Sequence, residues 1–539
     1  MNAVGLLEHF ERISEAPDAV ARLRRFVLDL AVRGKLVESA GVWSLHSSVA
    51  DFVDFQNGYA FKSEWFSKNG IRLCRNTNVG HGTLDWGKEA RVPARVASEF
   101  ERFYLAEGDL VLSLDRPIIS TGLKVARVQR PDLPCLLLQR VARALPDSEL
   151  ISLDYLFLWL QSSAFIGEID PGRSNGVPHI STKQVKSLAM DVPPLPEQHR
   201  IVAKVDELMA LCDELEAAQT TRENRRDRLV AATHHHLNNG DTDPETEATF
   251  KQTANFYFNH LPRLTTKPEH VQQLRQTILN LAVRGKLVEQ DPEDEPAAEL
   301  LKRIEEEKTR LSRIGKGKLD QPPGLFAEMD APFPLPETWR WVRVSDVANS
   351  RLGKMLDKAK NKGTYRRYLR NVNVRWFDFD LSDLLEMRFE EDELEKFALK
   401  SGDVLVCEGG EPGRAAVWDS RATDVYFQKA IHRVRLLGGI VPIYFARALY
   451  QDAASSRLKQ YFTGVTIKHL TGKGLAGYSF PLPPVAEQHR IVAKVDELMA
   501  FCDELDSQLA NSTNTHHQFL DATLNALAGA RDIEEGANA

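Results

Sequence analysis

The sequence predicts an α+β protein in which two globular mixed α/β domains are separated by an antiparallel pair of long coiled-coil helices. Two internal repeats carry this prediction. Residues 196–212 read PEQHRIVAKVDELMALC and residues 486–502 read AEQHRIVAKVDELMAFC, while LAVRGKLVE occurs at 30–38 and again at 281–289. Repeated pieces that bracket two longer, dissimilar bodies indicate an internal pseudo-two-fold duplication.

The repeats divide the 539 residues into more than one domain, as the length alone suggests. We predict an N-terminal helical segment, a first body, a central region with a long helix, a charged helix with a linker, a second body and a C-terminal long helix. In that order they span residues 1–39, 40–192, 193–290, 291–329, 330–482 and 483–539.

The longer repeat has apolar residues at alternating spacings of four and three, which is the pattern of a coiled-coil seam. Prolines precede both copies, where the start of a helix tolerates them. Weaker similarity continues beyond the repeat, so each helix is expected to run for roughly 40 residues. The seam positions are Ile201, Val205, Leu208, Cys212 and Leu215, and Ile491, Val495, Leu498, Cys502 and Leu505.

The shorter repeat predicts helices over 23–37 and 274–288, with Gly34 and Gly285 at the C-terminal caps. The two pairs of repeats are offset by 251 and 290 residues, so the second half contains 39 additional residues, which we place from Asp291 onward. This stretch predicts a charged helix from Pro296 to Arg313. Its charges indicate a solvated face, with contact to a partner protein as the alternative.

Within the bodies, strand-like runs precede helices predicted at 155–162 and 442–450, which is typical of a mixed α+β domain. The runs are 71–79, 109–114 and 123–128 in the first body and 368–376, 403–407 and 415–418 in the second. Four landmarks recur in the same order, which predicts one fold with two different surfaces. They are 75–79 with 370–374, 107–109 with 401–403, Gln139-Arg140 with Gln428-Lys429, and 176–181 with 464–471.

The charge distribution restricts where phosphate groups could bind. The whole chain has a net charge of −7. Residues 41–190 carry 17 Lys and Arg against 16 Asp and Glu, and residues 331–480 carry 24 against 18, which leaves −14 for the remainder. The two bodies are therefore the candidate nucleic-acid binders.

The sequence contains no run of about 18 uncharged apolar residues, so we expect no contact with a membrane. Its five cysteines form neither a disulfide framework nor a zinc-binding pattern, and we expect a reducing, cytoplasmic location.

Known catalytic motifs are missing, and we expect a non-catalytic chain without a metal site or a cofactor of its own. Gly472-Lys473-Gly474 lacks the glycine spacing of a P-loop. Residues 192–195 lack the amide or carboxylate that would hold an amino group in an adenine methyltransferase. His234, His235 and His236 have no partners at metal-ligand spacing and are predicted on a helix surface.

The basic and aromatic run at 365–376 suits duplex DNA, which requires cations for phosphates and planar donors for base edges. Strand alternation would place Arg366, Tyr368 and Arg370 on one face and Arg367, Leu369 and Asn371 on the other, although an ordinary basic strand edge is an open alternative. Our candidate DNA-binding residues are Lys62, Arg75, Asn76, Asn78, Gln139, Arg140, Arg173, Asn175, His179, Lys354, Arg366, Arg367, Arg370, Asn371, Asn373, Gln428, Lys429, Lys468 and His469.

The repeats, together with DEPAAELLKRIEEEK at 294–308 and PFPLPETWRWVRVSDVA at 332–348, resemble the specificity subunits of type I restriction–modification enzymes. The resemblance covers essentially the whole chain. It implies that residues 40–192 and 330–482 are target-recognition domains, each reading one part of a bipartite, asymmetric site in double-stranded DNA. It also implies that the long helices set the unread spacer between the two parts.

The same resemblance implies a restriction system that protects against phage, with DNA methylation by two methyltransferase (modification) subunits that bring S-adenosylmethionine, joined by restriction and translocase subunits. One departure is the entry to the first body, which lacks the proline-rich approach of 332–341 and predicts a slightly different seating of the two domains. Two alternatives are a self-contained DNA modification enzyme with an unrecognised active site and a coiled-coil protein scaffold.

Overall fold

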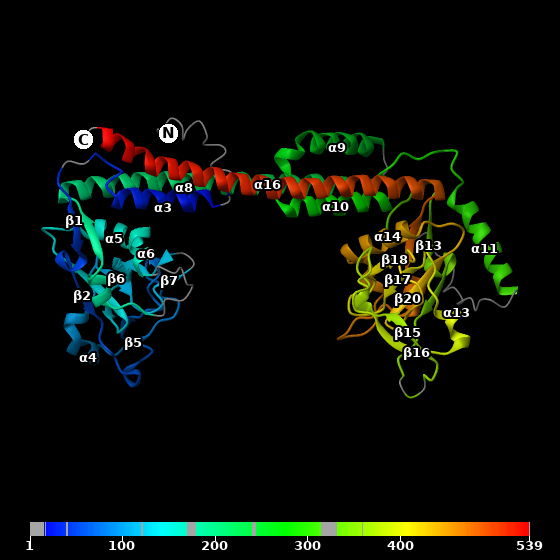
Figure 1. Ribbon diagram of the computed structural model, residues 1–539, viewed down its shortest axis with the longest axis horizontal. Helices are drawn as coiled ribbons and strands as arrows, with labels where there is room; N and C mark the ends of the chain where they lie inside the picture. Colours follow the sequence, from blue (N-terminus) through cyan, green and yellow to red (C-terminus); the bar gives the residue numbers. More distant parts are fainter. Residues whose placement is uncertain are drawn as a thin grey trace. The chain divides into compact units, whose positions relative to one another are not determined.

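The computed structural model describes residues 16, 18–38, 41–119, 122–169, 179–239, 244–313, 331–357, 359 and 361–537. The chain forms two compact units, one of Met1–Glu223 with Ser512–Ala539 and the other of Asn224–Asn511 (Figure 1). Each unit combines a globular α+β domain with pieces of both long helices.

The domain of the first unit is built on a five-stranded sheet of order β2-β11-β6-β9-β4 and a three-stranded sheet of order β10-β3-β5. The strands of the larger sheet are β2 (Val53–Asn57), β11 (Val141–Pro146), β6 (Leu110–Ser113), β9 (Val125–Arg127) and β4 (His81–Gly82). Those of the smaller sheet are β10 (Cys135–Leu137), β3 (Ile71–Cys74) and β5 (Arg91–Val92). Two strand pairs complete it, β1 (Ser44–Ser48) with β12 (Ala189–Val192) and β7 (Ile118–Ile119) with β8 (Gly122–Leu123).

The domain of the second unit repeats this plan with sheets of order β14-β20-β17-β18 and β16-β15-β19. Their strands are β14 (Ala348–Leu352), β20 (Ile431–Leu436), β17 (Val404–Cys407), β18 (Ala415–Val417), β16 (Leu385–Phe389), β15 (Thr364–Leu369) and β19 (Val425–Phe427). A further antiparallel pair joins β13 (Arg340–Arg343) to β21 (Ser479–Leu482). The predicted strand at 368–376 is wrong beyond Leu369, because Asn371–Asn373 forms a 3-10 turn.

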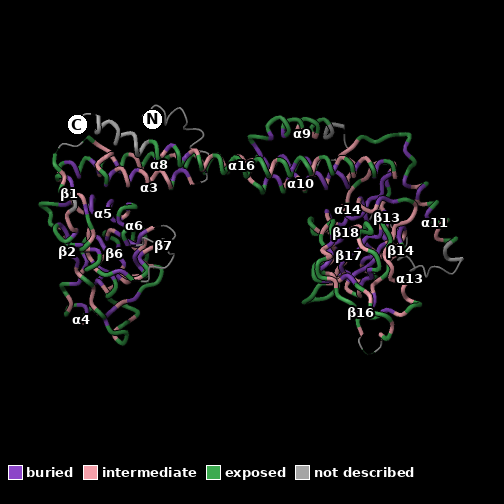
Figure 2. Tube along the Cα trace, in the orientation of Figure 1, coloured by how far each residue is buried: buried purple, intermediate pink, exposed green. Residues whose placement is uncertain are grey.

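The helices of the domains cover the sheets, and their apolar faces form the buried interior in Figure 2. In the first domain they are α4 (Ala94–Ala97), α5 (Leu153–Gln161), α6 (Ser163–Ile169) and α7 (Thr182–Lys186). In the second they are α12 (Val344–Val347), α13 (Leu394–Phe397), α14 (Pro442–Ala454) and α15 (Gly472–Gly477). The helices predicted at 155–162 and 442–450 are confirmed as α5 and α14.

The two long helices are α8 (Leu195–Asn239) and α16 (Val485–Ala537), of 45 and 53 residues. Each unit contains the first part of one and the last part of the other, so the two helices run antiparallel. In the second unit they pack together, since Val230 of α8 shares a buried cluster with Val495 and Cys502 of α16. The predicted duplication with two long antiparallel helices is confirmed.

Shorter helices complete the helical part of each unit. The first unit contains α3 (Ala19–Val32), and the second contains α9 (Pro244–Leu264), α10 (Pro268–Val283) and α11 (Ala297–Arg313). Seam residues of the long helices pack against the equivalent helices α3 and α10: Ile201 and Val205 share a cluster with Val27 and Leu28, and Ile491 and Val495 share one with Leu274 and Ile278. The two sequence repeats are therefore partners in one packing arrangement.

The caps predicted at Gly34 and Gly285 are confirmed, although α3 and α10 end earlier than expected, at Val32 and Val283. Both glycines have positive φ, at 68° and 70°. The amides of Lys35 and Lys286 then donate to the carbonyls of Leu30 and Leu281 at 2.9 and 3.0 Å, as in a Schellman motif. The end of each helix requires a residue with a left-handed backbone conformation, and glycine adopts this conformation without a steric cost.

The repeated Glu-Gln pair at the start of each long helix attaches that helix to its domain. The indole Nε1 of Trp43 donates to Glu197 Oε1 at 3.0 Å, and that of Trp339 donates to Glu487 Oε2 at 2.9 Å. The neighbouring glutamines accept from backbone amides at the N-termini of the domain helices: Gln198 from Ser152 and Gln488 from Val441, both at 2.8 Å. The predicted difference at the domain entry therefore leaves this local attachment unchanged.

The predicted charged helix is confirmed as α11. Its apolar residues Ala297, Leu300 and Ile304 are buried, and Leu300 and Ile304 lie against Gly438 of the second domain. Most of its charged residues, such as Lys302 and Glu305, are exposed. The interpretation of a solvated face thus applies to one side of the helix.

One histidine of the triplet departs from the prediction of a helix surface. His235 and His236 are exposed, but His234 is buried between α9 and α10. Its Nδ1 lies 2.9 Å from Thr277 Oγ1 and its Nε2 lies 3.3 Å from Tyr257 Oη. The prediction was wrong for His234 because α9 and α10 cover this face of α8.

Over the described part of the chain, no helix is both long and apolar enough to cross a lipid bilayer. The same residues contain no group of His, Cys, Asp and Glu side chains arranged to hold a metal ion. The five cysteines are buried thiols without disulfide partners, including Cys212 and Cys502 in the repeated helices.

Candidate nucleic-acid interface

In each domain, segments of two recurring landmarks bond to the residue that directly follows the strand β6 or β17. The amide of Leu114 donates to the Arg140 carbonyl at 2.8 Å, and the amide of Ile180 donates to the Leu114 carbonyl at 2.9 Å. In the second domain Glu408 takes the place of Leu114: its amide donates to Ala430 at 2.9 Å and its carbonyl accepts from Leu470 at 2.8 Å. The same arrangement of backbone bonds therefore occurs twice. We call it the frame of each domain: the bonds around Leu114 in the first domain and around Glu408 in the second.

This frame corrects one predicted correspondence. The amides of Leu138 and Gln428 donate to the equivalent carbonyls of Cys74 and Leu369, at 3.1 and 3.2 Å. The amides of the next residues also make equivalent bonds: Gln139 donates to the Tyr59 carbonyl at 2.9 Å, and Lys429 donates to the Lys354 carbonyl at 2.8 Å. Gln139 thus corresponds to Lys429, and Arg140 to Ala430. Pairing the two glutamines was wrong by one residue, because strand register rather than side-chain identity sets the equivalence.

The asparagines Asn78 and Asn373 are structural in both domains. They are 1% and 2% exposed. Asn78 Oδ1 accepts from the Arg75 amide at 3.2 Å and its Nδ2 donates to Asp85 and Lys88 carbonyls. Asn373 makes the matching bonds, from the Arg370 amide at 2.9 Å and to the Asp380 and Asp383 carbonyls. These amides are used within the turn, so we exclude both residues from the interface.

Three predicted residues of the first domain meet at one carboxylate that the sequence analysis did not single out. Asp115 Oδ2 accepts from Asn76 Nδ2 at 3.0 Å and from Arg140 Nη1 at 3.1 Å. Asp115 Oδ1 lies 2.9 Å from His179 Nδ1. The side chain of Asp115 is 14% exposed, whereas those of Arg140 and His179 are 61% and 63% exposed. The available signal was Asp115-Arg116-Pro117 directly after the strand predicted at 109–114.

Glycine occupies the equivalent place in the second domain. Asn371 Nδ2 donates to the carbonyl of Gly409 at 3.2 Å, and a Cβ added to Gly409 would lie 3.1 Å from His469 Nδ1. The Arg414 guanidinium donates through Nη2 to the carbonyl of Asn371 at 2.8 Å. The asparagine and histidine are therefore retained around the frame, and the central carboxylate is not.

The basic strand β15 is less open than its sequence suggested. Tyr368 packs with Met387, Phe389 and Tyr426, while Leu369 lies in a second cluster on the other face. The end of the strand is thus buried on both sides, so the alternation predicted for this run leaves neither face of Tyr368 and Leu369 open to DNA.

The arginines of this region have partners within the domain. Arg366 pairs with Asp424 at 2.8 Å, Arg367 Nη2 donates to the Thr423 carbonyl at 3.1 Å, and Arg370 pairs with Asp383 at 2.6 Å. Of the three, Arg367 is exposed. Arg75 likewise donates to the carbonyl of Lys88, in the turn that Asn78 stabilises.

The predicted lysines have different environments. Lys354 is 6% exposed and is paired with Glu393 over the ring of Phe389, so its ammonium is not available to a phosphate. Lys429 is exposed, and Lys468 is exposed with its Nζ donating to the Gly464 carbonyl at 2.8 Å. Lys62, 65% exposed, lies 3.7 Å from Glu64 and over Trp65. Gln139 is exposed and Gln428 half-buried, whereas Arg173 and Asn175 lie outside the described residues.

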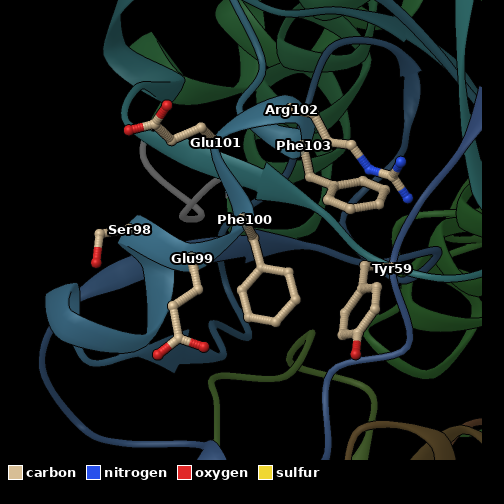
Figure 3. A pocket seen from close by; sticks show the side chains of 7 residues that line it. All are labelled: Tyr59, Ser98, Glu99, Phe100, Glu101, Arg102 and Phe103. Atoms are coloured by element: carbon tan, nitrogen blue, oxygen red, sulfur yellow. The ribbon is translucent and has the colours of Figure 1, made fainter.

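A cavity of about 450 Å³ lies beside the first frame, lined by Tyr59 and residues 98–103. Figure 3 shows the rings of Tyr59, Phe100 and Phe103 beside one another; the ring centroids of Tyr59 and Phe100 are 4.5 Å apart. The exposed carboxylates Glu99 and Glu101 belong to this lining and would repel a phosphate. We therefore place the cavity outside the interface.

Comparison with known proteins finds one family twice along the chain. A family model described as the type I restriction modification DNA specificity domain matches residues 46–223 and again 336–514. The EcoEI specificity subunit of Escherichia coli is 26% identical over 449 residues, which cover 78% of this chain and 73% of that subunit.

The similarity to the EcoAI specificity subunit of Escherichia coli is higher but shorter: 50% identity over 183 residues, covering 33% of this chain and 31% of that subunit. A crystal structure of the HsdS subunit from Thermoanaerobacter tengcongensis aligns over 91% of this chain and 97% of that chain, with 16% identity and a TM-score of 0.42. On the two family matches, the chain belongs to the DNA specificity subunits of type I restriction–modification enzymes, which are not themselves catalytic.

Proposed function

We propose that this chain recognises a bipartite, asymmetric site in double-stranded DNA, with residues 40–192 reading one part and residues 330–482 reading the other. The single observation that carries this proposal is the duplicated frame. Both domains form the same backbone bonds at the ends of β6 and β17, but the side chains at equivalent positions around these bonds differ between the domains. One scaffold with two unlike surfaces suits two modules that read different base sequences.

The exposed side chains around the two frames have the chemistry that DNA requires. Arg116, Arg140 and His179 surround the first frame, and Lys429 and Lys468 are exposed near the second. Lysine and arginine neutralise phosphates, and guanidinium and amide groups can form paired hydrogen bonds with base edges in the major groove. We assign phosphate contacts to Lys429 and Lys468, and direct base reading to Arg116, Arg140 and His179 together with Asn76, Asn371 and His469.

The long helices are proposed to set the length of the unread spacer between the two parts of the site. A 45-residue helix rises by about 1.5 Å per residue, which gives a rigid element on the order of 68 Å. The remaining helical regions would dock two methyltransferase subunits, which carry S-adenosylmethionine, and the restriction and translocase subunits would join that core.

The test uses the chain alone and the chain with its methyltransferase partner. We expect the isolated chain to transfer no methyl groups, and the complex to methylate adenine at one bipartite sequence that is read out by methylome sequencing. Methyl transfer by the isolated chain, or saturable binding of S-adenosylmethionine to it, would favour a self-contained enzyme. Binding that does not weaken with salt would argue against DNA as the ligand, because phosphate contacts release counterions.

A further inference from the structure

We infer that Arg140 reads a guanine in the part of the site recognised by the first domain, and that Asp115 is the positioning residue that aims its guanidinium. This inference rests on the proposed function, since it names the residues with which one of the two domains would distinguish bases. It assigns to Asp115 a role in selecting the DNA sequence that differs from a role in holding the fold together.

Asp115 is a mostly buried carboxylate that holds the exposed guanidinium of Arg140 in place. Its two carboxylate oxygens bind Asn76, Arg140 and His179 at 2.9–3.1 Å, and its side chain is 14% exposed. Arg140 is 61% exposed, and the contact to Asp115 engages Nη1. A guanidinium has five N–H donors in a planar fork, so one anchored nitrogen fixes the plane and leaves other donors for a ligand.

The backbone supports the same assignment. Arg116 and Arg140 have φ angles of 45° and 69°, in the left-handed region that residues other than glycine rarely adopt. The two residues belong to different segments, yet Arg116 is adjacent to Asp115 and Arg140 is bonded to it. Strained conformations of this kind persist where the surroundings hold them, and they concentrate at functional sites.

The second domain shows which of these side chains the scaffold itself requires. Positions equivalent to Asn76, Lys124 and His179 hold Asn371, Arg414 and His469, so an asparagine, a basic residue and a histidine recur in both domains. Positions equivalent to Asp115, Arg116 and Arg140 hold Gly409, Gly410 and Ala430, which follow from the strand registers. The frame therefore forms without the three charges, and these charges distinguish the first domain from the second.

A guanine base is the ligand that fits an anchored guanidinium best. Its O6 and N7 acceptors lie side by side in the major groove and match two donors of the arginine fork. A phosphate fits less well, since the carboxylate of Asp115 beside the fork repels an anion. A carboxylate that holds an arginine restricts its rotamers, which favours selectivity over simple charge neutralisation.

The experiment uses the full chain in complex with its methyltransferase, acting on a DNA library randomised over the recognised site. The variants are R140A, R140K, D115N, D115A and the double variant D115A/R140A, with K429A in the second domain as the matched control. We expect R140A to lower discrimination for guanine at one position by about 5- to 150-fold, the range of a lost bidentate base contact. The other part of the site should be unchanged.

R140K retains the charge but has no planar fork, so we expect it to bind DNA nearly as well and still lose the guanine preference. D115A and D115N should reduce the same preference, and D115A/R140A should be no less selective than R140A alone, since Asp115 acts through Arg140. K429A should weaken binding at all sequences equally.

Unchanged guanine preference in R140A and R140K, measured on variants that still melt cooperatively, would overturn the inference. A lower melting temperature of the D115 variants with unaltered base preference would assign Asp115 to the fold and would equally overturn it. Absence of any sequence preference in the wild-type complex would instead refute the proposed function, so the two failures are distinguishable.

Discussion

The indole of Trp339 donates a hydrogen bond to Glu487 at 2.9 Å, and this contact connects the residue directly before β13 to the start of α16. Both residues are 1% exposed. Glu487 also accepts from Gln290 Nε2, at 2.5 Å. The carboxylate thus joins the long helix, the domain and the segment that follows α10. Trp43 and Glu197 repeat the contact in the first unit.

Trp339→Phe is expected to destabilise the second unit because it removes a donor from a buried carboxylate and retains most of the apolar ring. Losing one hydrogen bond to a buried charged group costs about 1.5–3 kcal/mol. Urea unfolding of the wild type and the variant would measure this cost. Trp341→Phe is the matched control, since that indole donates to the carbonyl of Phe333 and its ring is only half-buried. An equal cost for both variants would contradict the role given to Glu487.

Glu487 should also give the folding stability a dependence on pH. Burial raises the pKa of Glu487, against the opposing effect of its bonds from Trp339 and Gln290. The folded state therefore retains this proton to a higher pH than the unfolded state. The contribution of Glu487 to the folding stability is greatest below its ordinary pKa. It is lost as the pH rises through the pKa that Glu487 has in the folded state. In Glu487→Gln this loss of stability as the pH rises above the ordinary glutamate pKa of 4.5 should be absent.

His234 should produce the opposite slope. Burial lowers the pKa of His234 to about 4, from an ordinary value of 6.5. The unfolded state then binds more protons between these values, so its contribution is complete above pH 6.5 and is lost as the pH falls toward 4, by at most about 3 kcal/mol. His234→Leu introduces the residue found at the equivalent position, Leu524, and should remove the slope. The exposed His235→Leu should retain it, and a flat wild-type profile in unfolding experiments would contradict this account.

Lys429→Ala should weaken DNA binding without changing the preferred sequence. The side chain is exposed on the second frame, where a lysine acts as a point charge for phosphate. Removing one phosphate contact is expected to reduce the slope of log K against log salt by about 1. Titrations at several salt concentrations would measure this, with Lys302→Ala on the exposed side of α11 as the control. A change in sequence preference would show that Lys429 contacts a base.

Inserting one helical turn near residues 217–221 of α8 should change the spacer that the complex tolerates and leave both half-sites intact. About four residues make one turn and add on the order of 6 Å. Methylome sequencing of a host that carries the variant would report the spacer and the half-sites together. An altered half-site would mean that this part of α8 contributes to base recognition rather than to spacing.

Features that depend on local chain chemistry could be predicted from the sequence. The caps at Gly34 and Gly285 follow from the left-handed conformation that a helix end requires, and α11 follows from its composition and spacing. The strands β6 and β17 were equally clear as apolar runs bounded by Gly-Asp turns.

The remaining features depend on contacts between distant segments. The burial of His234 requires α9 and α10 to cover it, and that of Lys354 requires Glu393 and Phe389 from another part of the domain. Asn78 and Asn373 have the composition of base-reading residues, and only the closed turns around them show otherwise. Asp115 was overlooked because its importance comes from three partners located 39, 25 and 64 residues away along the chain.

The antiparallel path of α16 has a consequence for the synthesis of the chain. Leu520 packs against Ala16 and Ala19, Asp521 pairs with Arg22, and His517 lies 3.2 Å from Asp18. A segment of the chain made late in synthesis thus completes the hydrophobic contacts of a segment made early. A nascent chain halted at Asn511 would contain every residue of the second unit while the first still awaited its closing segment.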